Sequence, residues 1–264
     1  MTEPVVRLDV DGPVATVTLN RPASRNAISG ELLTRLGEAM ATADADEEVR
    51  AVILTGADPA FCAGVDLKEI GRQGAVLGSS ASRENANHGP WTPVSKPVIA
   101  AVNGAAVTGG LELVLNCDIV IASDRALFAD THAQVGVLPG WGLSVLLPLA
   151  VGRSRARQMS FTGDFLPAAQ ALQAGLVSEV VPHDALLTRA REIAAAIAGN
   201  DARAVQALLA SYRQTEAEMV AAGYAAEQRA SREWGRSGLD LEESARRRAA
   251  ITERGRAQAG HRQS

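Results

Sequence analysis

The chain of 264 residues has only two cysteines and no excess of positive charge. Two cysteines are too few for a disulfide framework, so we expect Cys62 and Cys117 to be thiols in a reducing compartment, each a small buried residue. The formal net charge of -4 provides no cationic field around the molecule. We therefore expect no nucleic-acid partner.

Long hydrophobic runs are also missing. No uninterrupted apolar stretch approaches the ~20 residues that a bilayer-spanning helix needs. The first residues lack the basic segment followed by an apolar one that is typical of a secretory signal peptide. These absences predict a cytoplasmic protein with no membrane partner.

Several common catalytic motifs are absent as well. No Gly-x-Gly-x-x-Gly follows the first predicted strand, no Walker-type Gly-Lys-Ser/Thr occurs, and the stretch 142–146 fails the last position of the Gly-x-Ser-x-Gly elbow. The histidines show no metal-ligand spacing; they are His88, His132, His183 and His261. Neither a dinucleotide cofactor, a serine nucleophile nor a metal site is indicated.

What the sequence does contain is enough apolar residues, 47%, for a sizeable core. Up to about residue 182, short β-type runs alternate with helices that follow glycine clusters, which predicts an α/β core with parallel strand pairing. The chain opens with a predicted hairpin, because Asp11-Gly12 separates the β-type runs 5–9 and 14–20. Ser29 is positioned to cap the next helix.

After Pro182 the pattern becomes helical and rich in Ala, Arg and Glu. The predicted helices cover residues 183–199, 201–212, 215–234 and 241–256. We therefore divide the chain into a core, residues 1–182, and a C-terminal helical region, residues 183–264. Helices that cannot bury every apolar face alone would suit an interface with a neighbouring subunit.

The stretch from Val98 to Asp118 carries the clearest chemical signal. An apolar helix follows Gly109-Gly110, and Glu112 lies in its first turn. Adjacent glycines allow a ligand to approach the backbone, and N–H groups at a helix start can hold a developing oxyanion. The alternative is a glycine-eased helix–strand contact in which Glu112 only stabilises the helix N-terminus.

Four blocks, in order, make the chain resemble the crotonase family of enoyl-CoA hydratases and isomerases. They are Thr18–Pro22 with Asn26–Ile28, Phe61–Leu67, Val98–Asp118 and Gly136–Gly140. The resemblance implies a spiral of ββα units with a C-terminal all-helical region that builds homotrimers, which can pair into hexamers. It also implies an acyl-CoA thioester substrate, and no separate cofactor because coenzyme A is part of that substrate.

Carried over by position, the resemblance implies that the backbone N–H groups of Val65 and Gly109 form an oxyanion hole for the thioester oxygen. It implies that the loop 63–67 cradles coenzyme A, with Asp66 holding the loop amides. Lys68 and Arg25 are candidates for a phosphate contact, against the ordinary alternative of a surface cation. The substrate-binding residues implied in this way are Ala63, Gly64, Asp66, Leu67, Lys68, Gly110, Pro139, Gly140 and Trp141. Trp141 either lines the acyl pocket or caps the core.

The main departure from the family lies at residue 132. Hydratases of the family use two glutamates; Glu112 occupies the first position and His132 the second. A histidine can give or accept a proton near neutral pH, and a neighbouring Glu112 would favour the imidazolium form. The alternative is that His132 only lines the pocket. Asp130 could orient its imidazole, but we expect Asp130 to face solvent.

Three functions remain open on this sequence. The first is an enoyl-CoA hydratase that adds water to a 2-enoyl-CoA, with Glu112 and His132 as the proton-transfer groups. The second is an isomerase or another enzyme that works through a thioester enolate, since the same oxyanion hole would support it. The third is a catalytically silent acyl-CoA-binding protein, which the loss of the second glutamate would suit.

Overall fold

The computed structural model describes residues 3–66 and 89–236, and short pieces further on. These pieces are 243–244, 246–247, 250–251 and 253–254. The predictions made for Leu67 and Lys68 lie outside the described residues.

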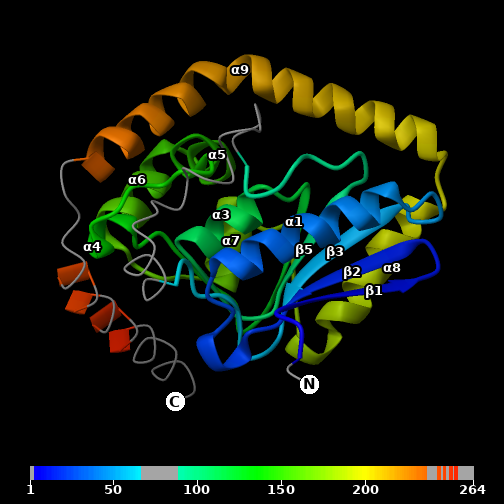
Figure 1. Ribbon diagram of the computed structural model, residues 1–264, viewed down its shortest axis with the longest axis horizontal. Helices are drawn as coiled ribbons and strands as arrows, with labels where there is room; N and C mark the ends of the chain where they lie inside the picture. The colour runs from blue at the N-terminus through cyan, green and yellow to red at the C-terminus, as the bar shows by residue number, and fades with distance from the viewer. Residues whose placement is uncertain are drawn as a thin grey trace.

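The larger of two sheets has six strands in the order β1-β2-β3-β5-β7-β10 (Figure 1). Its strands are β1 (Val6–Asp11), β2 (Val14–Leu19), β3 (Ala51–Gly56), β5 (Val98–Val102), β7 (Ile119–Ser123) and β10 (Glu179–Val181). The first two strands pair antiparallel, which confirms the predicted hairpin, and every other pair is parallel. β3 and β5 are buried along their whole length, as expected for parallel strands covered on both faces.

The smaller sheet has four strands in the order β4-β6-β8-β9. They are β4 (Ala60–Cys62), β6 (Ala105–Val107), β8 (Leu127–Ala129) and β9 (Leu166–Pro167). Each of β3, β5 and β7 is followed along the chain by a strand of this sheet, and helices α3 (Gly109–Leu115) and α4 (His132–Val135) follow β6 and β8. The chain is thus the predicted spiral of ββα units.

Helices cover both faces of the larger sheet. On one face lies α1 (Gly30–Ala45), whose start is capped as predicted because Ser29 Oγ accepts a hydrogen bond from the Leu32 N–H at 3.0 Å. On the other face lies α8 (Leu186–Ala198), with Leu186, Ala190 and Ala194 buried against the sheet. The division at residue 182 stays a prediction, although α8 beyond it completes the core of the sheet.

The remaining described helices follow strands of the smaller sheet or form the C-terminal part, apart from one short turn between β2 and α1. They are α5 (Leu143–Val151), α6 (Arg153–Thr162), α7 (Ala168–Ala174), α9 (Ala202–Arg236) and the single turns Pro22–Ser24 and His183–Ala185. The prediction of two helices over 201–212 and 215–234 is wrong, because α9 is one continuous helix of 35 residues. Arg213 and Gln214 favour helix, so nothing in the sequence interrupts it there. Figure 1 shows α9 arching across the molecule and passing over α5.

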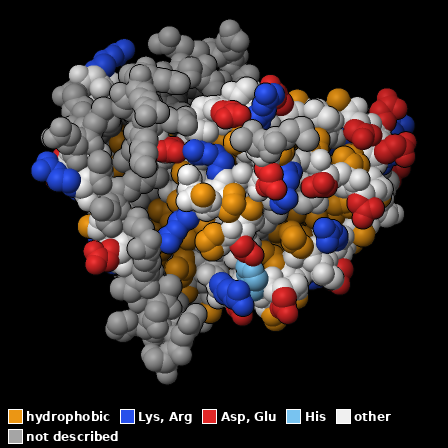
Figure 2. Space-filling view, turned by 60° about the horizontal axis from the view of Figure 1, so that its bottom comes forward, with side chains coloured by type: hydrophobic (Ala, Val, Ile, Leu, Met, Phe, Trp, Pro, Cys, Tyr) orange, Lys and Arg blue, Asp and Glu red, His pale blue; other side chains and the backbone are white. Residues whose placement is uncertain are grey.

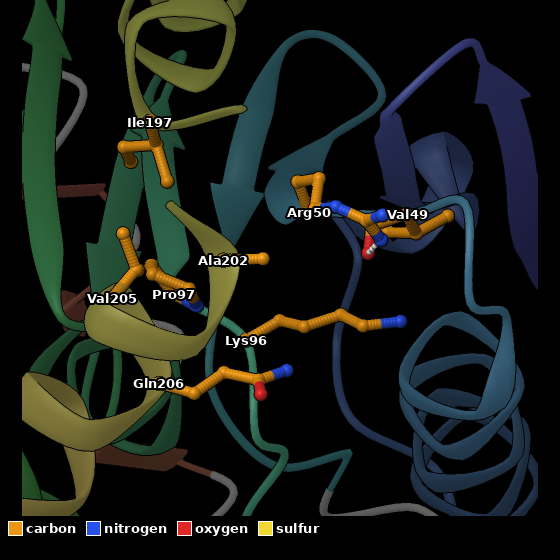
Figure 3. A pocket seen from close by; sticks show the side chains of 8 residues that line it. All are labelled: Val49, Arg50, Lys96, Pro97, Ile197, Ala202, Val205 and Gln206. Carbon is orange, nitrogen blue, oxygen red and sulfur yellow. Dashed lines mark hydrogen bonds between the residues drawn. The ribbon is translucent and has the colours of Figure 1, made fainter. Parts of the chain in front are cut away.

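Lys96 is a buried cation that serves the fold. Its side chain lies in a shallow hollow between the end of α1 and the start of α9 (Figure 3). Nζ donates hydrogen bonds to the carbonyl oxygens of Ala43, at 2.7 Å, and Asp46, at the C-terminal end of α1. A positive charge is favourable there because the last carbonyls of a helix lack internal donors. Burial lowers the pKa of Lys96, against the attraction of Asp44 and Asp46.

The surface mixes charge and apolar side chains. On the face shown in Figure 2, acidic and basic side chains are interspersed with hydrophobic ones. Among the residues that the structure describes, no helix is long and apolar enough to cross a bilayer.

Candidate active site

The glycine pair at the start of α3 has two different surroundings. A β-carbon at Gly110 would lie 2.2 Å from the carbonyl oxygen of Cys62, so only glycine allows α3 to approach β4 so closely. A β-carbon at Gly109 would lie 3.4 Å from Cγ2 of Val65. Gly110 therefore fits the packing alternative, and its predicted contact with substrate stays untested, whereas Gly109 faces the loop that carries the other predicted oxyanion donor.

The two predicted oxyanion donors are brought together. The loop at Gly64 packs on the start of α3, since a β-carbon at Gly64 would lie 3.6 Å from the Gly109 nitrogen. Val65 pairs with Ile28 in a parallel β-bridge. The hydrogen bonds of this bridge are donated by the N–H groups of Ile28 and Asp66, and not by that of Val65. Within residues 3–66 and 89–236, the N–H groups of Val65 and Gly109 donate no hydrogen bond. Both are therefore free to bind an oxygen atom of a ligand.

Glu112 is buried, with 3% of its surface exposed, and one of its oxygens is fully engaged. Oε1 accepts hydrogen bonds from the N–H groups of Gly140 at 3.1 Å and Trp141 at 2.7 Å. Asn116 reinforces this contact because its side-chain amide donates to the carbonyl oxygens of Glu112 and Trp141, at 2.8 and 3.0 Å. The second oxygen, Oε2, remains available for proton transfer.

Oε2 of Glu112 faces His132, which begins α4. The distance from Oε2 to Nε2 of His132 is 3.5 Å, and the other ring nitrogen, Nδ1, lies 2.6 Å from Oδ1 of Asp130. Asp130 also accepts the backbone N–H of His132 at 3.1 Å. The expectation that Asp130 faces solvent is wrong, because only 2% of its surface is exposed. A buried histidine thus lies between two buried carboxylates.

The two carboxylates determine the charge of His132. Burial by itself lowers the pKa of His132, but the hydrogen bonds and negative charges of Asp130 and Glu112 outweigh it and raise the pKa to about 10. Burial raises the pKa of Asp130, and the contacts with His132 together with a hydrogen bond from Ser160 more than reverse this, so that the pKa falls below its ordinary value. His132 is therefore an imidazolium at neutral pH, with both ring N–H groups as donors.

A pair of threonines joins the segments that carry Gly109 and His132. Thr108 has a φ of 56°, which is strained for a β-branched residue, and it directly precedes Gly109. Its hydroxyl lies 2.5 Å from the hydroxyl of Thr131, which directly precedes His132. The strained backbone and the hydroxyl pair fix the start of α3 against the start of α4.

The other predicted binding residues surround this centre. Asp66 forms an ion pair with Arg21 at 3.1 Å, so it holds its loop through a side chain that the prediction did not name. The Ala63 N–H donates to the carbonyl oxygen of Arg25 at 3.0 Å. Pro139 and Gly140 are half-buried, and Trp141 is 4% exposed within the main hydrophobic core. Their roles toward substrate stay predictions.

The sequence does not identify two residues that shape the site, and for a third, Asp130, the structure supports the alternative that it orients the imidazole of His132. Asn116 is one helical turn after Glu112, a weak signal. Glu227 lies on α9, where it binds the backbone immediately after Trp141, and nothing in the sequence connects it with the site. No cluster of three or more potential metal ligands occurs in the part of the chain that the structure describes.

Comparison with known proteins settles the family. The profile of the enoyl-CoA hydratase/isomerase family matches residues 9–249 of this chain. The chain belongs to the enoyl-CoA hydratase/isomerase family. The resemblance drawn from the four sequence blocks is thereby confirmed.

Individual members of the enoyl-CoA hydratase/isomerase family are similar over most of their length. A probable mitochondrial enoyl-CoA hydratase of Dictyostelium discoideum is 41% identical over 209 residues, which cover 77% of this chain and 75% of that protein. The crystal structure of enoyl-CoA hydratase from Mycobacterium tuberculosis superposes with a TM-score of 0.82 at 53% identity, covering 89% of this chain and 100% of the other. The enzyme from Mycobacterium smegmatis gives 0.81 at 52% identity, covering 89% and 100%.

Proposed function

We propose that this protein is an enoyl-CoA hydratase that adds water to the double bond of a 2-enoyl-CoA thioester. The observation that carries the proposal is the pair of Glu112 and His132, buried 3.5 Å apart, with Glu112 in the first turn of the helix that Gly109 begins. Among the described residues, the backbone N–H groups of Val65 and Gly109 donate no hydrogen bond. Hydration needs a base for water, an acid for the α-carbon and a site for the thioester oxygen, and these groups supply all three.

The two proton-transfer roles follow from the charges. With Oε1 of Glu112 held by two amides, Oε2 is the oxygen that removes a proton from water as the water oxygen bonds to the β-carbon. The electrons of the double bond move toward the thioester oxygen, where the N–H groups of Val65 and Gly109 form the proposed oxyanion hole. His132, as an imidazolium, gives its Nε2 proton to the α-carbon, and the proton on Glu112 then returns to His132 across the gap between them.

Hydration of crotonyl-CoA, followed by loss of the enoyl absorbance, tests this function. Glu112→Gln and His132→Asn should each lower kcat by about 100-fold or more, as expected for removal of a general base or acid. Glu38→Gln, a change at an exposed glutamate, is the matched control and should keep full activity. A wild-type protein that hydrates no enoyl-CoA, short or long, would contradict the proposal.

Two other outcomes would identify the remaining functions. A 3-enoyl-CoA converted to its conjugated isomer without any hydroxyacyl-CoA would make the protein an isomerase. Calorimetric binding of acyl-CoA with no turnover would make it a silent binder. Glu112→Gln distinguishes an enzyme from a silent binder. If the wild type has turnover and Glu112→Gln abolishes it, the protein is an enzyme.

We propose further that the protein is a cytoplasmic homotrimer. Large hydrophobic side chains are exposed along α9 and α6, which supports association; they are Leu208, Tyr212, Met219, Trp234 and Phe161. The two cysteines are thiols and not a disulfide, which is typical of a reducing compartment. Light scattering of the purified protein would test the trimer against a hexamer or monomer, and cell fractionation would test the compartment.

A further inference from the structure

Glu227 is a buried carboxylate that the proposed reaction does not use. It lies on α9, a helix of which only Leu209, Val220 and Glu227 are buried among the described residues 202–236. Oε1 accepts the N–H of Gly142 at 2.7 Å. Oε2 accepts the N–H of Ser144 at 2.6 Å and the Ser144 hydroxyl. These N–H groups are at the start of α5, where a helix has no internal acceptors for them.

One turn of α9 is fitted closely to this backbone. Gly142 has a φ of 92°, which favours glycine, and a β-carbon there would lie 2.3 Å from the Tyr224 ring, so that the ring would have to shift. A β-carbon at Gly223 would lie 3.1 Å from the Val145 side chain. α9 therefore contacts the start of α5 both through packing and through the carboxylate of Glu227. Figure 1 shows α9 passing over α5.

The segment held by Glu227 is continuous with the segment that holds Glu112. The N–H groups of Gly140 and Trp141 bind Glu112, and those of Gly142 and Ser144 bind Glu227. Four amides within five residues are thus divided between two buried carboxylates. Because consecutive peptide units share their backbone atoms, a shift at Gly142 must change where the Trp141 N–H points.

We propose that Glu227 is a positioning residue for the active site: by fixing Gly142 and Ser144 it keeps the Gly140 and Trp141 amides in place to hold Glu112. The inference rests on the proposed function, in which Glu112 is the base. It gives the C-terminal helix a part in the chemistry without contact with substrate. Oε1 of Glu112 keeps its two donors, and Oε2 stays directed toward His132, only while α9 is docked.

The test compares Glu227→Ala and Glu227→Gln with wild type in crotonyl-CoA hydration. Glu227→Ala should lower kcat roughly 10- to 100-fold, the loss expected when a catalytic group is misplaced. KM should change by no more than about twofold, because the substrate contacts are unaffected. Glu227→Gln retains one acceptor oxygen for Gly142 and should recover part of kcat.

Arg213→Met is the matched control. Arg213 also ties α9 to the body of the protein, through an ion pair with Asp118 at 3.0 Å and a hydrogen bond to the carbonyl oxygen of Val94, which lie outside the segment 140–144. This change should leave kcat near the wild-type value. An equal loss of kcat in Arg213→Met would show that any loosening of α9 suffices, and would overturn the specific role of Glu227.

A second measurement does not depend on activity. Residue-resolved amide hydrogen exchange should be faster at Gly140 and Trp141 in Glu227→Ala, although neither amide touches Glu227. Unchanged exchange at these two amides, or a kcat within about twofold of wild type, would overturn the inference. If the wild type hydrates no enoyl-CoA, the proposed function fails while the exchange result still decides the positioning role. If Glu227→Ala does not fold, kcat and amide exchange are measured instead in Glu227→Gln and Ser144→Ala.

Discussion

At the scale of single residues, the site is dominated by one cation between two anions. Asp130 and Glu112 lie on either side of His132 and share 2.6 and 3.5 Å contacts with its ring nitrogens. Removing either carboxylate would leave a buried charge without one of its partners, which is strongly unfavourable. The effects of substitutions at Asp130, His132 and Glu112 on stability are therefore expected to be non-additive.

His132 should make stability dependent on pH in the alkaline range. Its pKa is about 10 in the folded protein, above the ordinary 6.5, so the folded state binds its proton more tightly than the unfolded state does. This stabilisation is complete below pH 6.5 and is lost as the pH rises to about 10. Urea unfolding at a series of pH values should show the free energy of unfolding falling over this window more steeply in wild type than in His132→Asn. Parallel curves for the two proteins would contradict the assigned charge.

The threonine pair gives a second test at this scale. Thr131→Val preserves shape but leaves the buried hydroxyl of Thr108 without its partner, which should cost about 1–3 kcal/mol of unfolding free energy. In a Thr108→Gly background the same change should cost clearly less, because no hydroxyl is left unpaired. Chemical denaturation of the four proteins in the cycle measures the difference. Equal costs in both backgrounds would show that the hydroxyl contact contributes nothing.

At the scale of elements, the approach of α3 to β4 depends on one glycine. The β-carbon of Gly110→Ala would lie 2.2 Å from the Cys62 carbonyl oxygen, which is backbone and cannot rotate away. We expect this variant to lose about 1–3 kcal/mol or more through overpacking. Gly37→Ala, in α1 with open space around it, is the control and should be as stable as wild type or up to ~1 kcal/mol more stable. Similar melting temperatures for both variants would refute the close contact.

The sequence was informative wherever a local pattern decides the structure. The hairpin at Asp11-Gly12, the cap at Ser29 and the glycine-led start of α3 all follow from neighbours in the chain. The break predicted near residue 214 failed because Thr215 can cap a helix but here continues one. Glu227 could not be predicted, since it stands on a polar helix and meets the start of α5 only in the folded protein.

The candidate site was only partly predictable for the same reason. Glu112, His132, Val65 and Gly109 came from motifs whose order in the chain is sufficient to identify them. Asn116 is recognised as an orienting side chain only when distances are known, and distances are also needed to choose between the two alternatives for Asp130. The burial that sets the charge of His132 is a property of the packed core and has no signature in the sequence.

At the scale of the whole molecule, α8 lies beyond the predicted boundary at residue 182 and still packs on the larger sheet. The face of the larger sheet formed by Ile53, Ile99 and Ile121 is covered by α8, which begins after residue 182. A fragment of residues 1–182 would expose this face to water, and each large side chain uncovered costs about 1.5–3 kcal/mol. The division into core and helical region would then describe the sequence pattern but not independent folding units.

We therefore predict that the fragment 1–182 does not fold cooperatively. The fragment 1–200 retains α8 and should show the more cooperative unfolding transition of the two. Thermal unfolding followed by near-ultraviolet circular dichroism would compare them, with the full chain as reference. Fragment 1–200 still lacks α9 and hence Glu227, so it should show native-like packing of the larger sheet but little hydratase activity. A cooperative transition in 1–182 equal to that of 1–200 would show that α8 is dispensable and that residue 182 is a true domain boundary.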